Sequence, residues 1–330
     1  MRYRQFSDTD MYLSAISLGG LGIDEAVAHH VIDHGVNLVH MSTSYNNGSS
    51  IKILGKVLKE KRDKVYVALK ANFYKDSAED INPVLKELNT EYVDFIMFDR
   101  HKPSDVNDPK DVELFETWKK QGKVRYMGLT THKKVKECVA KGIEGGLYSL
   151  IMPVLNQPSL EVIAEEIKKA QEKKIGIMAM KTLKGMKKDE LKMPYLKKVL
   201  ANPAVTTVNK GFPTYEMFDE FLKNMQETLS AQEDFNLYRY AQENRNNNCM
   251  MCGECERICS EGIEISTLLR CKNYYYEELG DVETAKHVFD NIKISGRDIR
   301  FCDECKKCET RCPNSIQIVN ELKNVSQLFV

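Results

Sequence analysis

Nine of the ten cysteines lie between residues 249 and 312, and their spacing is the strongest constraint on what this chain can fold into. They include two runs with the pattern C-x2-C-x2-C-x3-C, which are Cys249, Cys252, Cys255, Cys259 and Cys302, Cys305, Cys308, Cys312. This pattern is typical of ferredoxins with two [4Fe–4S] clusters, in which the fourth cysteine of each run binds the other cluster. The spacing therefore predicts one cluster on Cys249, Cys252, Cys255 and Cys312, and a second on Cys302, Cys305, Cys308 and Cys259.

Paired zinc sites are the alternative interpretation of these cysteines. Zinc sites use two CxxC pairs separated by a spacer, whereas each run here places four cysteines within eleven residues. Pro313 follows the second run, as in ferredoxins, but Ser260 follows the first. Cys138 and Cys271 have no partner at ligand spacing, so we expect both to be buried apolar side chains.

The cysteine distribution also predicts two domains, residues 1–240 and 241–330, because residues 1–248 contain a single cysteine. The polar stretch 242–248 fits a linker. The 48 basic and 48 acidic side chains balance, which argues against a nucleic-acid partner. No apolar run is long enough to span a membrane, and the first residues lack the features of a signal peptide, so we expect a cytoplasmic protein with free thiols.

Short apolar runs alternate with amphipathic helical patterns through the first 230 residues. The eight candidate strands are Ile16–Gly20, Leu38–Met41, Val65–Lys70, Val93–Phe98, Val124–Leu129, Ser149–Leu155, Ile175–Met180 and Ala204–Val208. This count predicts an α/β chain, a (β/α)8 TIM barrel followed by a small ferredoxin-like α-helical iron–sulfur domain. An open doubly wound sheet is the alternative, although no GxGxxG follows the first strand. Residues 1–13 could form a hairpin at the barrel floor, and the segment between the cysteine runs is expected to form helices that pack on the barrel.

Six segments of this alternating region resemble the aldo-keto reductase family, in order and in spacing. They are residues 35–48, 54–58, 64–70, 92–98, 124–132 and 176–181. Together with the cysteine runs, they resemble the branch of that family that carries a C-terminal ferredoxin-like domain with two [4Fe–4S] clusters. The resemblance implies a TIM barrel and hydride transfer between NADPH and a carbonyl compound.

The resemblance also implies four catalytic positions at the C-terminal ends of the barrel strands. Tyr45 and Lys70 occupy the tyrosine and lysine positions, whereas His40 stands at the aspartate position and Asp99 at the histidine position. The carboxylate and the imidazole are therefore exchanged, and Lys70 would receive its anion from another direction. His101, two residues after Asp99, is a candidate replacement for the family histidine, and a metal ion held by His40, Asp99 and His101 is a further alternative.

The nicotinamide-binding positions are only partly retained. Thr130 and Asn156 match the positions that face the nicotinamide in the family, and Lys210 and Gly211 match the loop that binds its phosphates. The asparagine that contacts adenine in the family is replaced by Phe221. NAD(P)H binding is therefore an open question on the sequence.

Three functions remain open at this point. In the first, the chain is an oxidoreductase that moves electrons between its clusters and a small organic substrate, with a ferredoxin or another redox protein as partner. In the second, it is an NAD(P)H-dependent carbonyl reductase with structural clusters. In the third, it is a non-catalytic electron-transfer subunit that docks a redox partner.

Overall fold

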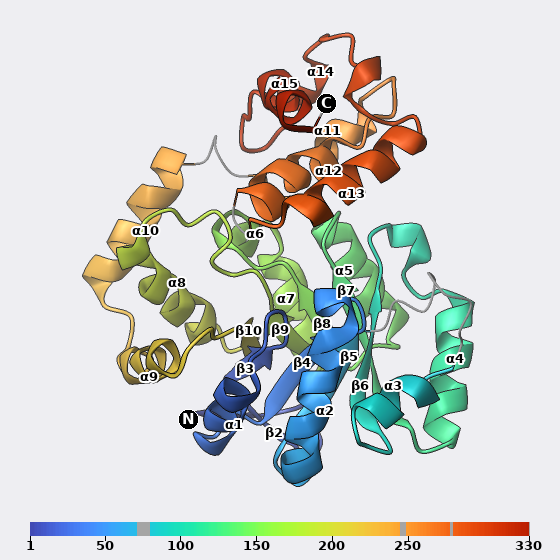
Figure 1. Ribbon diagram of the computed structural model, residues 1–330. Coiled ribbons are helices and arrows are strands. Elements are labelled where there is room, and N and C mark those ends of the chain that lie inside the picture. The colour runs from blue at the N-terminus through green and yellow to red at the C-terminus, as the bar shows by residue number, and fades with distance from the viewer. Residues whose placement is uncertain (71–79, 245–248, 278–279, 330) are drawn as a thin grey trace.

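The chain folds into a closed parallel β-barrel with helices around it and a set of smaller helices over one end (Figure 1). The computed structural model describes residues 1–70, 80–244, 249–277 and 280–329. The barrel strands follow the order β10-β3-β4-β5-β6-β7-β8-β9, and β10 pairs with both β3 and β9 to close it. The strands are β3 (Ile16–Gly19), β4 (Leu38–Ser42), β5 (Tyr66–Lys70), β6 (Val93–Asp99), β7 (Val124–Thr131), β8 (Leu150–Pro153), β9 (Gly176–Ala179) and β10 (Thr207–Lys210). The (β/α)8 prediction is confirmed and the open sheet is excluded.

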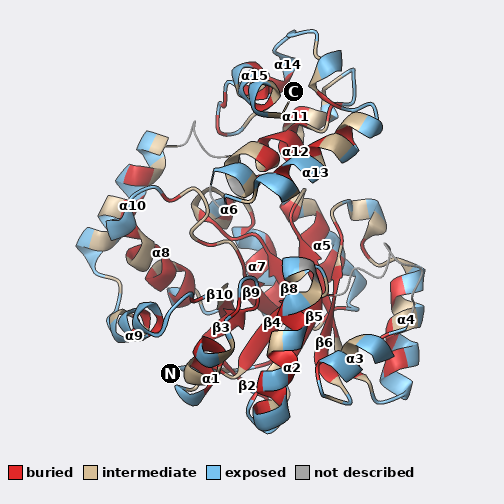
Figure 2. Ribbon diagram, in the orientation of Figure 1, coloured by how far each residue is buried: buried red, intermediate tan, exposed pale blue. Residues whose placement is uncertain are grey.

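Each barrel strand lies where a run rich in β-branched and other apolar residues was predicted. Such runs suit parallel strands because helices outside and side chains inside bury both faces, and Figure 2 shows the barrel strands as buried. The predicted strand bounds differ from the observed ones by up to three residues at an end. The amphipathic pattern of residues 160–172 predicts a single helix, but the structure has two, because the backbone leaves helical geometry at Ile163, with φ −110° and ψ 16°.

An antiparallel hairpin of β1 (Tyr3–Gln5) and β2 (Tyr12–Ser14) precedes the barrel, as predicted. Phe6, in its turn, packs edge-on against Phe95 and Tyr126, with ring centroids 5.1 Å and 5.7 Å away. A Cβ atom at Gly176 would lie 2.7 Å from the Phe6 ring, so a side chain there would displace it. The hairpin therefore closes the N-terminal end of the barrel and leaves the opposite end, which we call the barrel mouth, for a site.

The barrel helices form a ring outside the strands. They are α1 (Glu25–Asp33), α2 (Ser49–Lys61), α3 (Asn82–Glu87), α4 (Pro109–Lys120), α5 (Val135–Gly145), α6 (Gln157–Val162), α7 (Ala164–Glu172), α8 (Asp189–Ala201), α9 (Tyr215–Asn224) and α10 (Ala231–Asn244). Short 3-10 turns lie at η1 (Tyr45–Gly48), η2 (Arg62–Lys64) and η3 (Pro103–Asp105). Among the described residues, no helix combines the length and the apolar character needed to cross a membrane.

The C-terminal segment, residues 249–329, forms α11 (Glu254–Arg257), α12 (Ile265–Arg270), the π-helical turn η5 (Cys271–Tyr276), α13 (Val282–Ile294), η6 (Ile299–Phe301), α14 (Lys307–Thr310) and α15 (Ile318–Phe329). It has its own hydrophobic core, separate from that of the barrel. The helices between the cysteine runs pack mainly into this second core rather than on the barrel, because their apolar residues, such as Leu268 and Phe289, face α15 and one another. The segment lies over the barrel mouth (Figure 1), where Lys133 Nζ pairs with Glu264 at 3.1 Å.

Candidate functional site

The barrel mouth holds a pocket of 240 Å³ lined by residues that follow or end several different strands. His40 lies in β4, Tyr45 begins the turn after it, and Lys70 ends β5. Thr130 of β7 and Gly211, directly after β10, also line this pocket. Parallel strands place all their C-terminal ends at one end of the barrel, which is why residues far apart in sequence meet here.

Lys70 and Asp99 form a buried ion pair beside this pocket, with Lys70 Nζ 3.1 Å from Asp99 Oδ2. The other carboxylate oxygen, Oδ1, lies 3.7 Å from His101 Nε2 and 3.8 Å from His132 Nε2. Burial acts to raise the pKa of Asp99, but Lys70 and His101 outweigh it and hold this pKa below its usual value. Asp99 is therefore the carboxylate that pairs with Lys70.

Tyr45 lies near both the imidazole of His40 and the ammonium of Lys70. Its ring centroid lies 6.0 Å from that of His40, and Lys70 Nζ lies 5.7 Å from the Tyr45 centroid. Burial and the nearby Asp99 carboxylate raise the pKa of Tyr45 well above its ordinary value. Burial is the larger of these two causes, and the nearby Lys70 ammonium is paired with Asp99. The phenol retains its proton and can donate a hydrogen bond.

His40 is almost fully buried, and neither ring nitrogen has a hydrogen-bond partner among the described residues. Burial, reinforced by Lys70, lowers the pKa of His40 to about 3, so the imidazole is neutral near pH 7. A buried polar group without a partner costs free energy, and His40 lines the mouth pocket, so a ligand there could supply the missing bond. A single metal ion on His40, Asp99 and His101 is not supported, because their ligand atoms do not converge within 4.8 Å.

Three further residues at the barrel mouth were not predicted. His132, directly after β7, lines the pocket, and burial lowers its pKa well below the ordinary value. Lys181, just after β9, also lines it, and burial followed by the charge of Arg270 lowers the pKa of Lys181. The sequence could have indicated His132 and Lys181 as site residues, because both come shortly after a predicted barrel strand. Arg270 comes from the C-terminal segment, and nothing in the sequence places it here.

The residues predicted to bind a nicotinamide cofactor are only partly brought together. Thr130 and Gly211 line the mouth pocket, and Thr130 Oγ1 has no hydrogen-bond partner among the described residues. Asn156 instead caps α6, accepting a hydrogen bond from Ser159 N at 3.2 Å. Lys210 Nζ lies 5.0 Å from the Phe212 ring centroid and outside this pocket.

The segment that would face an adenine is filled by aromatic side chains. Phe221 is buried, and its ring centroid lies 5.2 Å from that of Phe212, which in turn lies 5.1 Å from that of Phe218. The replacement of the family asparagine by Phe221 therefore turns this position into hydrophobic core.

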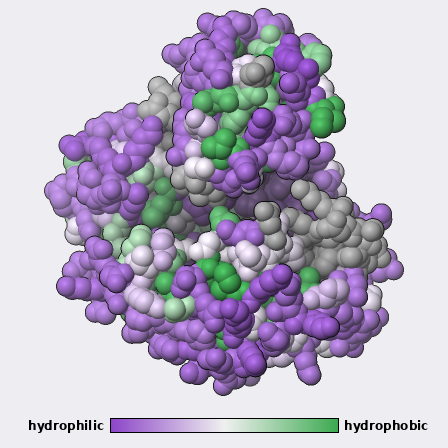
Figure 3. Space-filling view, viewed as in Figure 1, coloured by the Kyte–Doolittle hydropathy of each residue, from purple (hydrophilic) through white to green (hydrophobic). Residues whose placement is uncertain are grey.

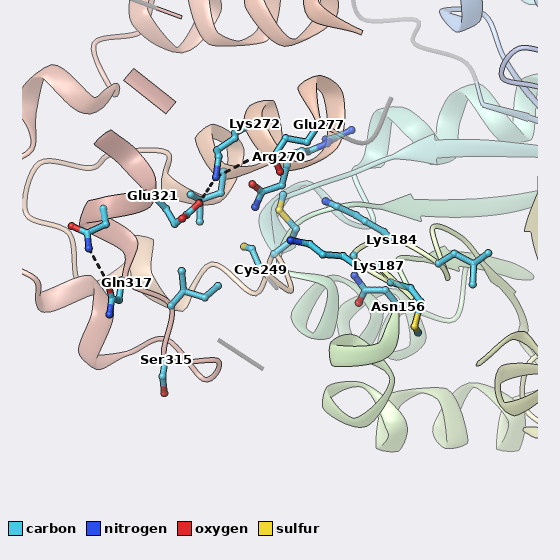
Figure 4. A pocket seen from close by; sticks show the side chains of 18 of the residues that line it. Asn156, Lys184, Lys187, Cys249, Arg270, Lys272, Glu277, Ser315, Gln317 and Glu321 are labelled. Atoms are coloured by element: carbon cyan, nitrogen blue, oxygen red, sulfur yellow. Dashed lines mark hydrogen bonds and ion pairs between the residues drawn. The ribbon is translucent and has the colours of Figure 1, made fainter. Parts of the chain in front are cut away.

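A larger cavity of 730 Å³ lies between the barrel and the C-terminal segment. In Figure 3 the surface is hollowed between these two parts of the molecule. Figure 4 shows Cys249 between Lys184 and Lys187 on the barrel side and Lys272 and Glu321 on the C-terminal side. Asn156 and Arg270 also line this cavity.

Four cysteines of the C-terminal segment line one pocket. They are Cys249, Cys252, Cys255 and Cys312, although Cys312 is far from the others in sequence. Burial, followed by the charge of Glu309, raises the pKa of Cys308 to about 11, and smaller contributions from Cys302 and Cys259 indicate that these three thiols lie near one another. Cys305, the last member of the second predicted group, is exposed. Cys138 and Cys271 are both fully buried, as expected.

The spacing of the sulfur atoms argues against single zinc ions. Zinc bonds of about 2.3 Å in a tetrahedron hold the sulfurs about 3.8 Å apart. Among the described residues, only His30, His34 and Asp219 bring three ligand atoms within 4.8 Å of one another, and no three cysteines do. The described cysteines therefore lack the close spacing of a zinc site, and a cubane, which places four irons between its cysteines, requires wider spacing.

The buried neutral histidines predict acid sensitivity. The pKa of His40 is lowered to about 3 and, mainly by burial, that of His101 to about 4, so the unfolded chain binds more protons than the folded chain between these values and pH 6.5. The free energy of unfolding is therefore not reduced by these histidines above pH 6.5, and it falls as the pH falls through this window. Within this window each histidine lowers the free energy of unfolding by about 1.4 kcal/mol for each unit that the pH falls.

Replacing His40 by Leu should therefore reduce the loss of stability between pH 7.5 and pH 5.5 by about 1.4 kcal/mol, measured by urea unfolding under anaerobic conditions. The substitution of the exposed His287 by Leu is the matched control. An unaltered profile in the His40→Leu variant would contradict the assignment of a buried neutral imidazole.

Comparisons with known proteins agree with this architecture. The Bacillus subtilis proteins YqkF, an uncharacterized oxidoreductase, and YhdN, an aldo-keto reductase, are 26% and 29% identical to the chain over 163 and 157 residues. These matches cover 43% and 39% of this chain, and the chain spans only 53% and 47% of those two proteins.

Solved structures show the same fold. The aldo-keto reductase AKR11C1 from Bacillus halodurans, in its holo form, matches with a TM-score of 0.58 and 21% identity, over 72% of this chain and 96% of that one. A Klebsiella pneumoniae aldo-keto reductase in complex with NADPH matches with a TM-score of 0.57 and 18% identity, over 69% of this chain and 91% of that one. The sequence profile of the Aldo/keto reductase family matches residues 24–244, about two thirds of the chain, and the chain therefore belongs to that family.

Proposed function

We propose that this protein is an iron–sulfur oxidoreductase with a modified aldo-keto reductase site. In this proposal residues 1–240 form a barrel that binds a small organic substrate, and residues 241–330 form a ferredoxin-like domain with two [4Fe–4S] clusters. The observation that carries it is the four-cysteine pocket, one of whose members, Cys249, also lines the 730 Å³ cavity beside the barrel mouth. A cluster held there would lie next to the space where a substrate can bind.

The eight ligands would be those that the spacing indicates, Cys249, Cys252, Cys255 and Cys312 for one cluster and Cys302, Cys305, Cys308 and Cys259 for the other. When bound, two clusters supply one electron each, drawn from a ferredoxin or another low-potential protein donor, and so match the two electrons that reduction of a carbonyl to an alcohol consumes. We also propose a cytoplasmic location, where such clusters and free thiols persist.

The barrel residues have distinct roles in this proposal. The protonated phenol of Tyr45 donates a hydrogen bond to the substrate oxygen and then its proton, while the second proton that joins the carbon comes from solvent. Asp99 holds Lys70 beside the pocket, and the neutral imidazole of His40 offers a second polar contact for a bound substrate. His101, whose Nε2 lies 3.7 Å from the buried Oδ1 of Asp99, helps to position that carboxylate.

An NAD(P)H-dependent carbonyl reductase is the second candidate. It is favoured by the NADPH complex of the Klebsiella relative and by the presence of Thr130 and Gly211 in the mouth pocket. A dinucleotide would find fewer contacts here than the family uses, because Phe221 is buried, Asn156 caps a helix and Lys210 lies against Phe212. We therefore place this function second.

Anaerobic titration of the holoprotein distinguishes the candidates. We expect dithionite or reduced ferredoxin to bleach the iron–sulfur absorbance and NADH and NADPH to have no effect, with substrate carbonyls restoring the absorbance. Bleaching by a nicotinamide, or its consumption with a carbonyl, would favour the second candidate instead. Replacing Tyr45 by Phe should slow reoxidation by substrate about a hundredfold or more, whereas a docking subunit would not respond to loss of this hydroxyl.

A further inference from the structure

We infer that His30, His34 and Asp219 form a binding site for a divalent transition-metal ion of the zinc type, and none of the three lines the mouth pocket. His30 lies in the last turn of α1, His34 is the C-cap of that helix, and Asp219 lies in α9. The ion would join the helices that follow β3 and β10, the two strands whose pairing closes the barrel. The inference does not depend on the proposed function.

The ligand atoms of this site are already close together. One atom from each of the three side chains lies within 4.8 Å of the other two, and His30 Nε2 is 2.7 Å from Asp219 Oδ1. Zinc bonds of about 2.0–2.1 Å to nitrogen and oxygen in a tetrahedron place the ligand atoms about 3.4 Å apart. The side chains of His30 and Asp219 are 25% and 53% exposed and His34 is exposed, so small rotations are sufficient to bring the three atoms around one ion.

The end of α1 orients the two imidazoles. Residues four apart in a helix lie on the same face, and the ring centroids of His30 and His34 are 4.1 Å apart. His34 Nδ1 lies 2.8 Å from the backbone oxygen of His30, and because a carbonyl only accepts, Nδ1 carries the proton and Nε2 keeps the lone pair that binds a metal. Histidine ligands in metal sites are typically held by such a hydrogen bond from the other ring nitrogen.

Helix α9 holds the carboxylate against these imidazoles. It packs beside α1 (Figure 1), and its Tyr215 and Phe218 rings have centroids 4.9 Å and 5.8 Å from that of His30. These contacts restrict the His30 ring and keep Nε2 directed at Asp219. An ion between Nε2 and Oδ1 replaces the proton that these two atoms share, which moves to Nδ1 of the same ring.

The donor set defines the class of ion. Two imidazoles and one carboxylate are ligands of zinc and related transition metals, with water completing the coordination. Magnesium and calcium bind instead to sites built from oxygen atoms. Because the three ligands come from two helices, a bound ion should stabilise the folded barrel against unfolding.

Calorimetric titration of the anaerobic holoprotein with zinc chloride tests this inference. His34→Gln and Asp219→Asn each remove one ligand from an exposed position, and we expect each to weaken zinc binding at this site at least tenfold, the loss that removal even of a ligand's hydrogen-bond partner can cause. The matched control is His29→Gln, because His29 lies in the same helix but outside the cluster, and it should retain the affinity. Zinc should also raise the urea midpoint of the wild type and of His29→Gln but not of His34→Gln, and magnesium chloride should have no such effect.

Three results would each overturn the inference: no zinc binding at millimolar concentration, equal zinc affinity in the wild type and in both site variants, or an equal response to magnesium. Circular dichroism confirms that the variants are folded. Zinc that displaces iron from cysteines would do so equally in the wild type and in the variants. The difference between the wild type and His34→Gln therefore reports on this site alone, whatever the iron content.

Discussion

Replacing Cys312 by Ala is expected to lower the iron content of the anaerobically reconstituted protein from about eight to about four atoms per chain. Cys312 lines the same pocket as Cys249, Cys252 and Cys255, and without it that pocket offers three thiolates. Cluster binding contributes to the folding free energy of small domains, so the C-terminal segment should also lose thermal stability. Iron and sulfide analysis, with circular dichroism during heating, measures both effects.

Cys271→Ala is the matched control for this experiment. Cys271 lies in the same segment and is fully buried, but it belongs to neither cysteine run. Its substitution should leave the iron content unchanged and lower the thermal stability only by the lost packing of one sulfur atom. Retention of eight irons in the Cys312→Ala protein would show that the ligand sets differ from those proposed.

Replacing Lys70 by Met should destabilise the protein by about 3–5 kcal/mol and reduce turnover at least a hundredfold. The side chains of Lys70 and Asp99 are 9% and 13% exposed, so loss of the ammonium leaves a carboxylate that water reaches poorly. The same change removes a charge that lines the mouth pocket. Urea unfolding at pH 7.5 and reoxidation of the reduced protein by substrate measure the two effects.

Two variants test the physical cause of this effect. The pair Lys70→Met with Asp99→Leu removes both charges and should recover most of the stability without recovering turnover, because an apolar pair of similar volume replaces the buried ion pair. Lys61→Met is the control, since the Lys61 side chain is also 9% exposed but its partner Asp33 is 50% exposed and remains hydrated. Its expected cost is about 1 kcal/mol or less. If Lys61→Met and Lys70→Met cost the same, the buried carboxylate is not the cause.

Local patterns were sufficient to predict most of the fold. Each of the eight strands is a short apolar run bounded by helical segments, and burial on both faces of a parallel barrel makes such runs recognisable without knowledge of their partners. The same patterns did not resolve the break at Ile163, because one non-helical residue does not alter the periodicity of its neighbours. They also did not separate helices that pack into the second core from helices that pack on the barrel.

The sequence predicted the position of a site residue only where that residue lies at the end of a strand. Tyr45 and Lys70 line the mouth pocket, and Asp99 pairs with Lys70 beside it, because strand ends of a parallel barrel meet at one place. Asn156 follows β8 and Lys210 ends β10, yet Asn156 caps a helix and Lys210 lies against Phe212. The direction of a side chain after a strand depends on the conformation of its loop, which the sequence pattern does not specify.

The sequence by itself determined the barrel, through eight apolar runs, and the candidate cluster ligands, through the spacing of two cysteine runs. Only the tertiary structure decided that Arg270 reaches the barrel mouth, that burial and the Asp99 carboxylate keep Tyr45 protonated, and that a cavity adjoins Cys249. The physical reason is distance along the chain. Periodicity and motif spacing arise from neighbouring residues, whereas the charge and shape of a site depend on residues hundreds of positions apart that meet only when the C-terminal segment covers the barrel.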